Sequence, residues 1–234
     1  MNRRGFIARP LVLIILAALT GLAQAASGTV VHLSGSLSVK RGDNPPQIMS
    51  RNSEVSPGDV LTTEKDSYAQ INFTDGSSIT LRPNTTVEIE AYTFVREQPQ
   101  QDNKFLRLIK GGMRTVTGLI GRRGNEDAYK IGTQQATIGI RGSSGDTLEC
   151  AEGCEGVTPT SDKLPPGLYH ATYTGAYILQ NDGGSLLVGP GQTGYVKDSK
   201  TPPSALTKDP GLGLSQLPFA LGVPGAPGAE CIVR

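Results

Sequence analysis

The sequence of 234 residues has no tryptophan, only two histidines and three cysteines, and no marked excess of either charge. A near-neutral chain lacks the basic surface that nucleic acid or an anionic membrane attracts. Its longest apolar run, residues 11–23, is about 13 residues long, whereas a membrane-spanning helix needs about 20. With His32 and His170 as its only histidines, the chain has few groups for zinc binding or acid–base chemistry. We therefore expect no nucleic-acid partner, no spanning helix and no metal or cofactor.

The first residues carry an export signal. Arg3, Arg4 and Arg9 precede the apolar run, and a small-x-small pattern follows it at residues 23–25. This order predicts a bacterial-type signal peptide over residues 1–26, cleaved near Ala25/Ala26, and a periplasmic or secreted mature protein. The paired arginines also fit a twin-arginine signal, so the Sec and twin-arginine routes both stay open. Cleavage leaves 19 basic against 21 acidic residues, a net charge of about −2.

From residue 28 onward the apolar residues alternate with polar ones, which is typical of strands. Thirty glycines and sixteen prolines add frequent turns. A dozen or so short strands need a second layer to cover their apolar faces. We predict an all-β domain over residues 27–198, built from successive hairpins as an elongated sandwich or roll. Its expected core includes Phe73, Ile79, Leu81 and Ile138.

Two segments interrupt or follow this pattern. Residues 145–166 are polar, and residues 199–234 are rich in proline and glycine, so we expect an insertion and an irregular tail. Residues 212–221 form either a short helix or an apolar strap over the domain. The insertion is acidic, and its spacing fits a solvated loop better than a calcium site. The acids concerned are Asp146, Glu149, Glu152, Glu155 and Asp162.

The three cysteines predict one disulfide and one leftover thiol in an oxidising compartment. Three pairings are open. We favour Cys150 with Cys154, which closes a small loop. The alternative is that Cys231 ties the tail back to the domain.

Candidate contact residues fall into two groups. Arg122, Arg123 and Arg141 flank glycines, and guanidinium groups recognise carboxylates and anionic glycans through paired hydrogen bonds. The alternative for Arg122 and Arg123 is a solvated loop, and the alternative for Arg141 is a structural hydrogen-bonding role.

Tyrosines 169, 173 and 177 form the second group, because tyrosines on a sheet stack on sugars or anchor protein interfaces. The alternative for Tyr169, Tyr173 and Tyr177 is packing in the core. No nucleophile motif accompanies either histidine, so we predict no catalytic residue.

The order of several short motifs resembles the FecR domain family of bacterial envelope proteins over roughly residues 28–196. The resemblance rests on GSLSV at 35–39, GDVLTT at 58–63, the alternating segment 69–81 with its DGS turn, LRLIKG at 106–111, ATIGIRG at 136–142, residues 167–175, and GQ at 191–192.

Membership implies a periplasmic all-β module. The anchored members of this family relay a signal from an outer-membrane receptor to a sigma-factor regulator. Only about ten residues precede the apolar run here, so we expect a stand-alone form without the anti-sigma segment.

Together these features predict a non-enzymatic periplasmic binding or scaffold module that engages an envelope protein or glycan. One alternative is a regulatory input domain acting on a membrane sensor or signalling protein. Another is an enzyme acting on cell-wall polymers through paired carboxylates, although no pair stands out.

Overall fold

A computed structural model describes residues 26–125, 127–150, 153–158, 161 and 164–213. The described residues form strands β1 to β15 and the short 3-10 helix η1 (Pro99–Gln101). The predicted signal peptide, the sequence after residue 213 and Cys231 lie outside the described residues. No helix in the described part of the chain is long and apolar enough to cross a membrane.

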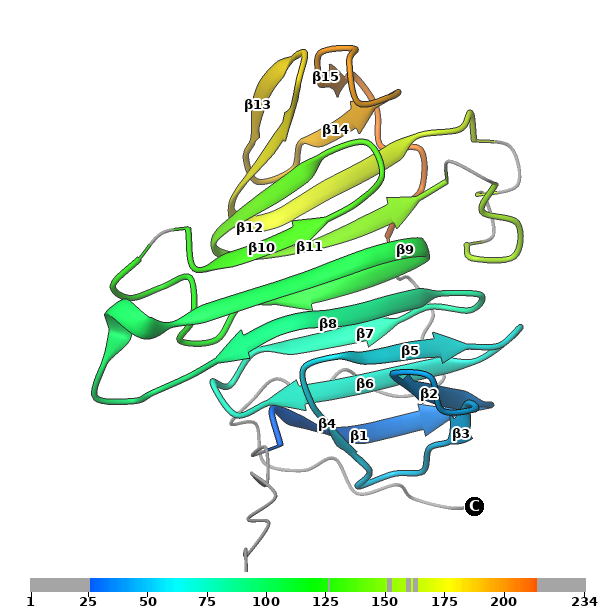
Figure 1. The fold of residues 1–234 in the computed structure, drawn as a ribbon. Coiled ribbons are helices and arrows are strands. Elements are labelled where there is room, and N and C mark those ends of the chain that lie inside the picture. The colour runs from blue at the N-terminus through cyan, green and yellow to red at the C-terminus, as the bar shows by residue number, and fades with distance from the viewer. Residues whose placement is uncertain (1–25, 126, 151–152, 159–160, 162–163, 214–234) are drawn as a thin grey trace, which may run out of the picture.

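Strand pairing runs through the molecule along two paths, which we call the first and the second layer (Figure 1). The first layer consists of β3 (Gln47–Ile48), β2 (Leu37–Arg41), β5 (Asp59–Thr63), β8 (Thr86–Thr93), the beginning of β9 (Asn103–Val116), β10 (Tyr129–Gly132), the beginning of β11 (Thr137–Glu149), the end of β12 (Leu168–Asn181) and β13 (Gly184–Val188).

The second layer is built in the same way from the other halves of the long strands. It consists of β4 (Glu54–Val55), β1 (Gly28–Ser34), β6 (Tyr68–Phe73), β7 (Ser78–Leu81), the end of β9, the end of β11, the beginning of β12, β14 (Thr193–Val196) and β15 (Ser204–Leu206).

Strands β9, β11 and β12 belong to both layers because they bend sharply, and each bend contains a glycine. Gly111, Gly142 and Gly175 have φ values of +86°, +60° and +70°, a region that side chains with a Cβ rarely adopt. A Cβ on Gly175 would also lie 2.7 Å from the carbonyl oxygen of Gly142. Glycine at the bends therefore lets one continuous sheet fold over onto itself.

The main core lies between the two layers. It includes Leu61 and Leu106 from the first layer and Ile71 and Met113 from the second, all fully buried. The predicted core residues Phe73, Ile79, Leu81 and Ile138 are at most 4% exposed, so the strand phases drawn from alternation are confirmed. The all-β class is confirmed as well.

Four details differ from the sequence-based expectation. Strand β9 continues through Lys110, Gly111 and Gly112, although consecutive glycines disfavour a strand, because the glycines make a bend rather than an end. Strand β10 runs parallel to β9, so the fold is not a simple series of hairpins.

Strand β11 extends to Glu149 and takes in the first residues of the predicted insertion, and β15 lies in the predicted irregular tail. Both segments are polar, but their backbones pair with β9, β12 or β14.

A smaller apolar cluster covers the outer side of the second layer, and we call it the outer cluster. Cys150 and Cys154 form a disulfide within it, and the alternative partner, Cys231, lies outside the described residues. Because the loop after β11 and the tail after β15 both contribute, this cluster attaches them to the sheet. Its buried members are Leu148, Cys150, Cys154, Val157, Tyr169, Ala171 and Leu212.

Candidate functional site: an arginine-lined bowl

The loop between β9 and β10 and the bend of β11 together form a concave surface of about 720 Å³, which we call the arginine bowl. Arg122, Arg123 and Arg141 all line it, although nearly twenty residues separate the pair from Arg141. Figure 1 shows the green loop before β10 at the left end of the sheet. The other lining residues are Gly121, Gly124, Asn125, Gly142 and Thr174.

Arg123 holds the bowl together. Its Nε and Nη2 donate to the two carboxylate oxygens of Asp102, both at 3.1 Å, and Nη2 also donates to the carbonyl of Val95 at 3.0 Å. The guanidinium carbon lies 4.9 Å from the ring centre of Phe94. Asp102 is 3% exposed, so the pair neutralises a carboxylate that would otherwise be buried alone. Arg123 is therefore a structural residue, whereas the sequence suggested either a contact residue or a solvated loop.

The DGS turn between β6 and β7 fixes the other side of the loop. The carbonyl of Asp75 accepts from the N–H of Leu119 at 2.8 Å, and its Oδ2 accepts from the N–H of Ile120 at 3.2 Å. Gly118 sits so close to this turn that a Cβ there would lie 2.3 Å from the backbone nitrogen of Ser77. The turn therefore also positions the loop that carries Arg122 and Arg123.

A buried lysine lies beneath the DGS turn, at a position that no sequence motif marks. The Lys104 ammonium donates to Ser77 Oγ at 2.6 Å and lies 3.5 Å and 4.6 Å from the ring centres of Phe73 and Tyr129. Burial lowers the pKa of Lys104 to about 7, while the charge of Asp75 opposes this shift. Strand alternation could have indicated that Lys104 is buried, because position 104 has the same inward phase as positions 106 and 108 in β9.

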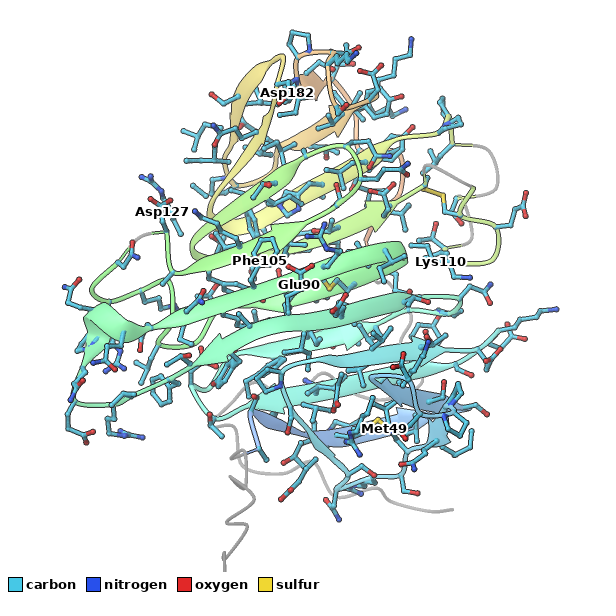
Figure 2. All side chains as sticks on the ribbon, viewed as in Figure 1. Met49, Glu90, Phe105, Lys110, Asp127 and Asp182 are labelled. Atoms are coloured by element: carbon cyan, nitrogen blue, oxygen red, sulfur yellow. A yellow bond between two sulfur atoms is a disulfide. The ribbon has the colours of Figure 1, made fainter. Side chains whose placement is uncertain are left out.

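Arg122 and Arg141 provide the exposed charge of the bowl. Both side chains are exposed, and Arg122 forms no ion pair with any side chain that the structure describes. Gly142 lies between them, and a Cβ at this position would lie 3.5 Å from Cγ of Arg122. Asp127, labelled in Figure 2, has a carboxylate oxygen 4.0 Å from Nζ of Lys130. Two exposed guanidinium groups over a glycine floor form a site suited to an anion.

The candidate tyrosines do not join this site. Tyr177 is fully buried and its hydroxyl lies 2.9 Å from Thr115 Oγ1. Tyr169 is 3% exposed in the outer cluster and donates to the carbonyl of Pro165 at 2.8 Å. Tyr173 is 38% exposed and donates to Asp146 Oδ2 at 2.6 Å. Only Tyr173 offers its ring to solvent, and it lies on the outer side of the second layer.

The two histidines lie in different parts of the second layer, with β6, β7, β9 and β11 between their strands. His170 is fully buried, and its Nδ1 lies 2.9 Å from Thr147 Oγ1. Burial lowers the pKa of His170 to about 3, so the ring is neutral at ordinary pH. This places His170 in the core rather than in a two-histidine site.

The predicted acidic loop is only partly a loop. Asp146 and Glu149 are each 1% exposed in β11, so a solvated position is wrong for both. Glu155 is exposed, whereas Glu152 and Asp162 lie outside the described residues. Among the residues that can be placed, no three acids, histidines or cysteines come together as metal ligands.

The fold and the bowl define an all-β protein with an arginine-lined concavity at one end. Residues 59–154 match the model of the FecR protein family. This stretch runs from β5 to the second cysteine of the disulfide and includes the DGS turn and all three bowl arginines. Residues 59–154 are therefore similar to the FecR family, as the motifs within this stretch predicted.

Two solved structures are similar, both of a "putative anti-sigma factor" from Parabacteroides distasonis ATCC 8503. Each is 12% identical, with TM-scores of 0.47 and 0.46, over 64% of this chain. This chain spans 60% of the length of those proteins. A comparison with curated protein sequences gave no match.

Proposed function

We propose that the mature protein is an exported, non-enzymatic binding module. It engages an envelope protein or glycan that carries carboxylate, phosphate or sulfate groups, and it does so through Arg122 and Arg141. The observation that carries this proposal is the arginine bowl, in which two exposed guanidinium groups stand on a rigid support. The proposed location follows from the export signal at residues 1–26.

The rigidity of the bowl supports binding rather than general solvation. Asp75, Asp102 and Arg123 fix the loop from below through the hydrogen bonds given above, so the backbone that carries Arg122 needs little ordering when a ligand arrives. Preorganised guanidinium groups give up less entropy per hydrogen bond than a mobile lysine would.

A second candidate function is a regulatory input, and the match to the FecR family favours it. The anchored members of that family relay signals across the envelope. If this candidate is right, ligand binding in the arginine bowl would change the activity of a membrane sensor or signalling protein. Comparing the envelope transcriptome of a deletion strain with strains carrying the wild-type and the Arg122→Ala/Arg141→Ala genes tests this candidate. The regulatory candidate requires the envelope transcriptome of the double variant to resemble that of the deletion strain.

Isothermal titration of the exported protein with polygalacturonate, a carboxylate polysaccharide, and with a tetraglutamate peptide tests the binding proposal. The variant is Arg122→Ala/Arg141→Ala. The matched control is Arg51→Ala/Lys65→Ala, which removes the same charge from two exposed positions outside the bowl.

We expect wild type and the control to bind alike, and the bowl variant to bind at least about tenfold more weakly. The two probes separate a glycan from an acidic protein as the source of the carboxylates. If the bowl variant and the control lose the same affinity, net charge explains the binding and the proposal is wrong. If wild type binds neither probe nor inorganic phosphate, the bowl is not an anion site.

A further inference from the structure

The tail after β15 rests on the sheet through one side chain. Residues 207–213 belong to no strand, and Leu212 is the only one of them that is buried, at 0% exposure. Asp209 Oδ1 accepts from the N–H groups of Gly211 and Leu212 at 2.9 and 3.0 Å. These bonds are internal to the segment. They form a compact turn that presents Leu212 to the sheet.

The surface that receives Leu212 lies in the outer cluster, and we call it the Leu212 seat. Leu148, Val157, Tyr169, Ala171 and the Cys150–Cys154 disulfide form it. These groups come from β11, the loop after it, and β12. None of these groups belongs to the tail, and together they give the seat an apolar lining suited to a leucine-sized side chain.

A buried arginine at the edge of the seat contacts the backbone of the tail. Arg82 is 1% exposed, and its Nη2 donates to the carbonyl oxygen of Leu212. The Nε of Arg82 has no hydrogen-bond partner among the described residues. The site thus recognises an apolar side chain together with the carbonyl oxygen of the same residue.

Charge around Arg82 favours an oxygen acceptor. Arg82 Nη2 lies 2.8 Å from Asp146 Oδ2, and Arg114 donates to both oxygens of Asp146 at 2.8 Å. In the ion pairs that the structure describes here, two guanidinium groups thus share one carboxylate close to the Leu212 carbonyl. Burial lowers the pKa of Arg82, but a guanidinium remains charged in proteins. A carbonyl dipole in this position offsets part of the buried charge.

We propose that the Leu212 seat is a peptide-binding site, which residues 207–213 occupy in cis. In trans it takes a partner peptide that presents a leucine flanked by glycine in a similar turn, because that is the chemistry now seated there. The tail then acts as a built-in competitor that the partner displaces. This site is separate from the arginine bowl, and either can exist without the other.

Fluorescence polarisation with a labelled peptide of residues 208–213 tests the proposal on the full mature chain. The variant Leu212→Asp removes the competitor, because an aspartate cannot occupy an apolar seat. Leu187→Asp is the matched control, since Leu187 is 62% exposed on β13 in the other layer. A second peptide, with aspartate in place of its leucine, tests whether the anchor is required.

We expect Leu212→Asp to bind the peptide at least about tenfold more tightly than wild type, because the seat is no longer occupied in cis. The Leu187→Asp control should bind like wild type, and the aspartate peptide should bind none of the proteins. Equal binding to all three proteins, or no binding to Leu212→Asp at millimolar peptide, would overturn the proposal.

Circular dichroism and Leu212→Ala guard against a folding artefact. Leu212→Ala removes most of the anchor without adding charge, and it should keep the wild-type spectrum and bind the peptide more tightly than wild type. If both variants at position 212 unfold, the tail is an integral part of the core and the proposal is wrong.

Discussion

The buried Lys104 gives the protein a pH dependence that the structure allows us to estimate. The side chain is fully buried and its folded-state pKa is lowered by burial to about 7. In the unfolded chain a lysine titrates near 10.4. Between these two values the unfolded state binds more protons than the folded state, so this residue makes the protein more stable as the pH rises.

The perturbation is Lys104→Met, which keeps an unbranched side chain and removes the titrating group. Between pH 7 and pH 9 the wild type should gain about 2 kcal/mol of unfolding free energy relative to the variant. This is an upper estimate, because the rings of Phe73 and Tyr129, 3.5 and 4.6 Å away, favour the charged form. All other titrating groups cancel in the comparison.

Urea unfolding followed by circular dichroism at pH 7, 8 and 9 measures the difference, since the chain has no tryptophan to report by fluorescence. The difference between wild type and Lys104→Met should grow with pH. A difference that stays constant from pH 7 to pH 9 would refute the reasoning. It would mean that the aromatic rings and Ser77 keep the ammonium charged inside the protein.

Four further substitutions, one of them a control, test the fold. Phe73→Ala should lower the unfolding free energy by about 3–5 kcal/mol, because it empties a core position, and a loss below about 1 kcal/mol in urea unfolding would contradict the strand phase. Cys154→Ser should cost about 2 kcal/mol by releasing a short closed loop, and a thermal midpoint that reduction leaves unchanged would argue against the disulfide. Arg123→Ala should cost about 2–3 kcal/mol, because it leaves Asp102 buried without its partner, whereas Arg122→Ala should change stability by less than about 0.5 kcal/mol.

Strand alternation predicted the core of this protein well, because a strand with one buried face must place every second side chain inside. Phe73, Ile79 and Leu81 followed that rule. The rule fails where the long strands bend. Tyr173 and Tyr177 are four residues apart and should share a face, yet one is half exposed and the other fully buried. The pairing of β11 with β12 shifts register between them, and Gly175 makes the bend.

The bowl and the buried charges depend on contacts between distant segments. Glycine-flanked arginines suggested a contact surface, but only the fold shows that Arg141 joins Arg122 and that Arg123 instead binds Asp102. The burial of Asp146 could not be predicted from the sequence either, because it also depends on contacts between distant segments. Its counter-ions, Arg82 and Arg114, lie just after β7 and on β9 respectively, more than thirty residues earlier in the sequence.

The dependence of anion binding on ionic strength tests the central claim most directly. Binding of tetraglutamate to the exposed pair Arg122 and Arg141 should weaken steadily between about 50 and 300 mM salt, because mobile ions screen exposed charges. The Arg122→Ala/Arg141→Ala variant should lose most of this salt dependence, and the Arg51→Ala/Lys65→Ala control should retain it. A bowl variant whose salt dependence matches that of wild type would contradict the account, because it would place the anion elsewhere on the protein.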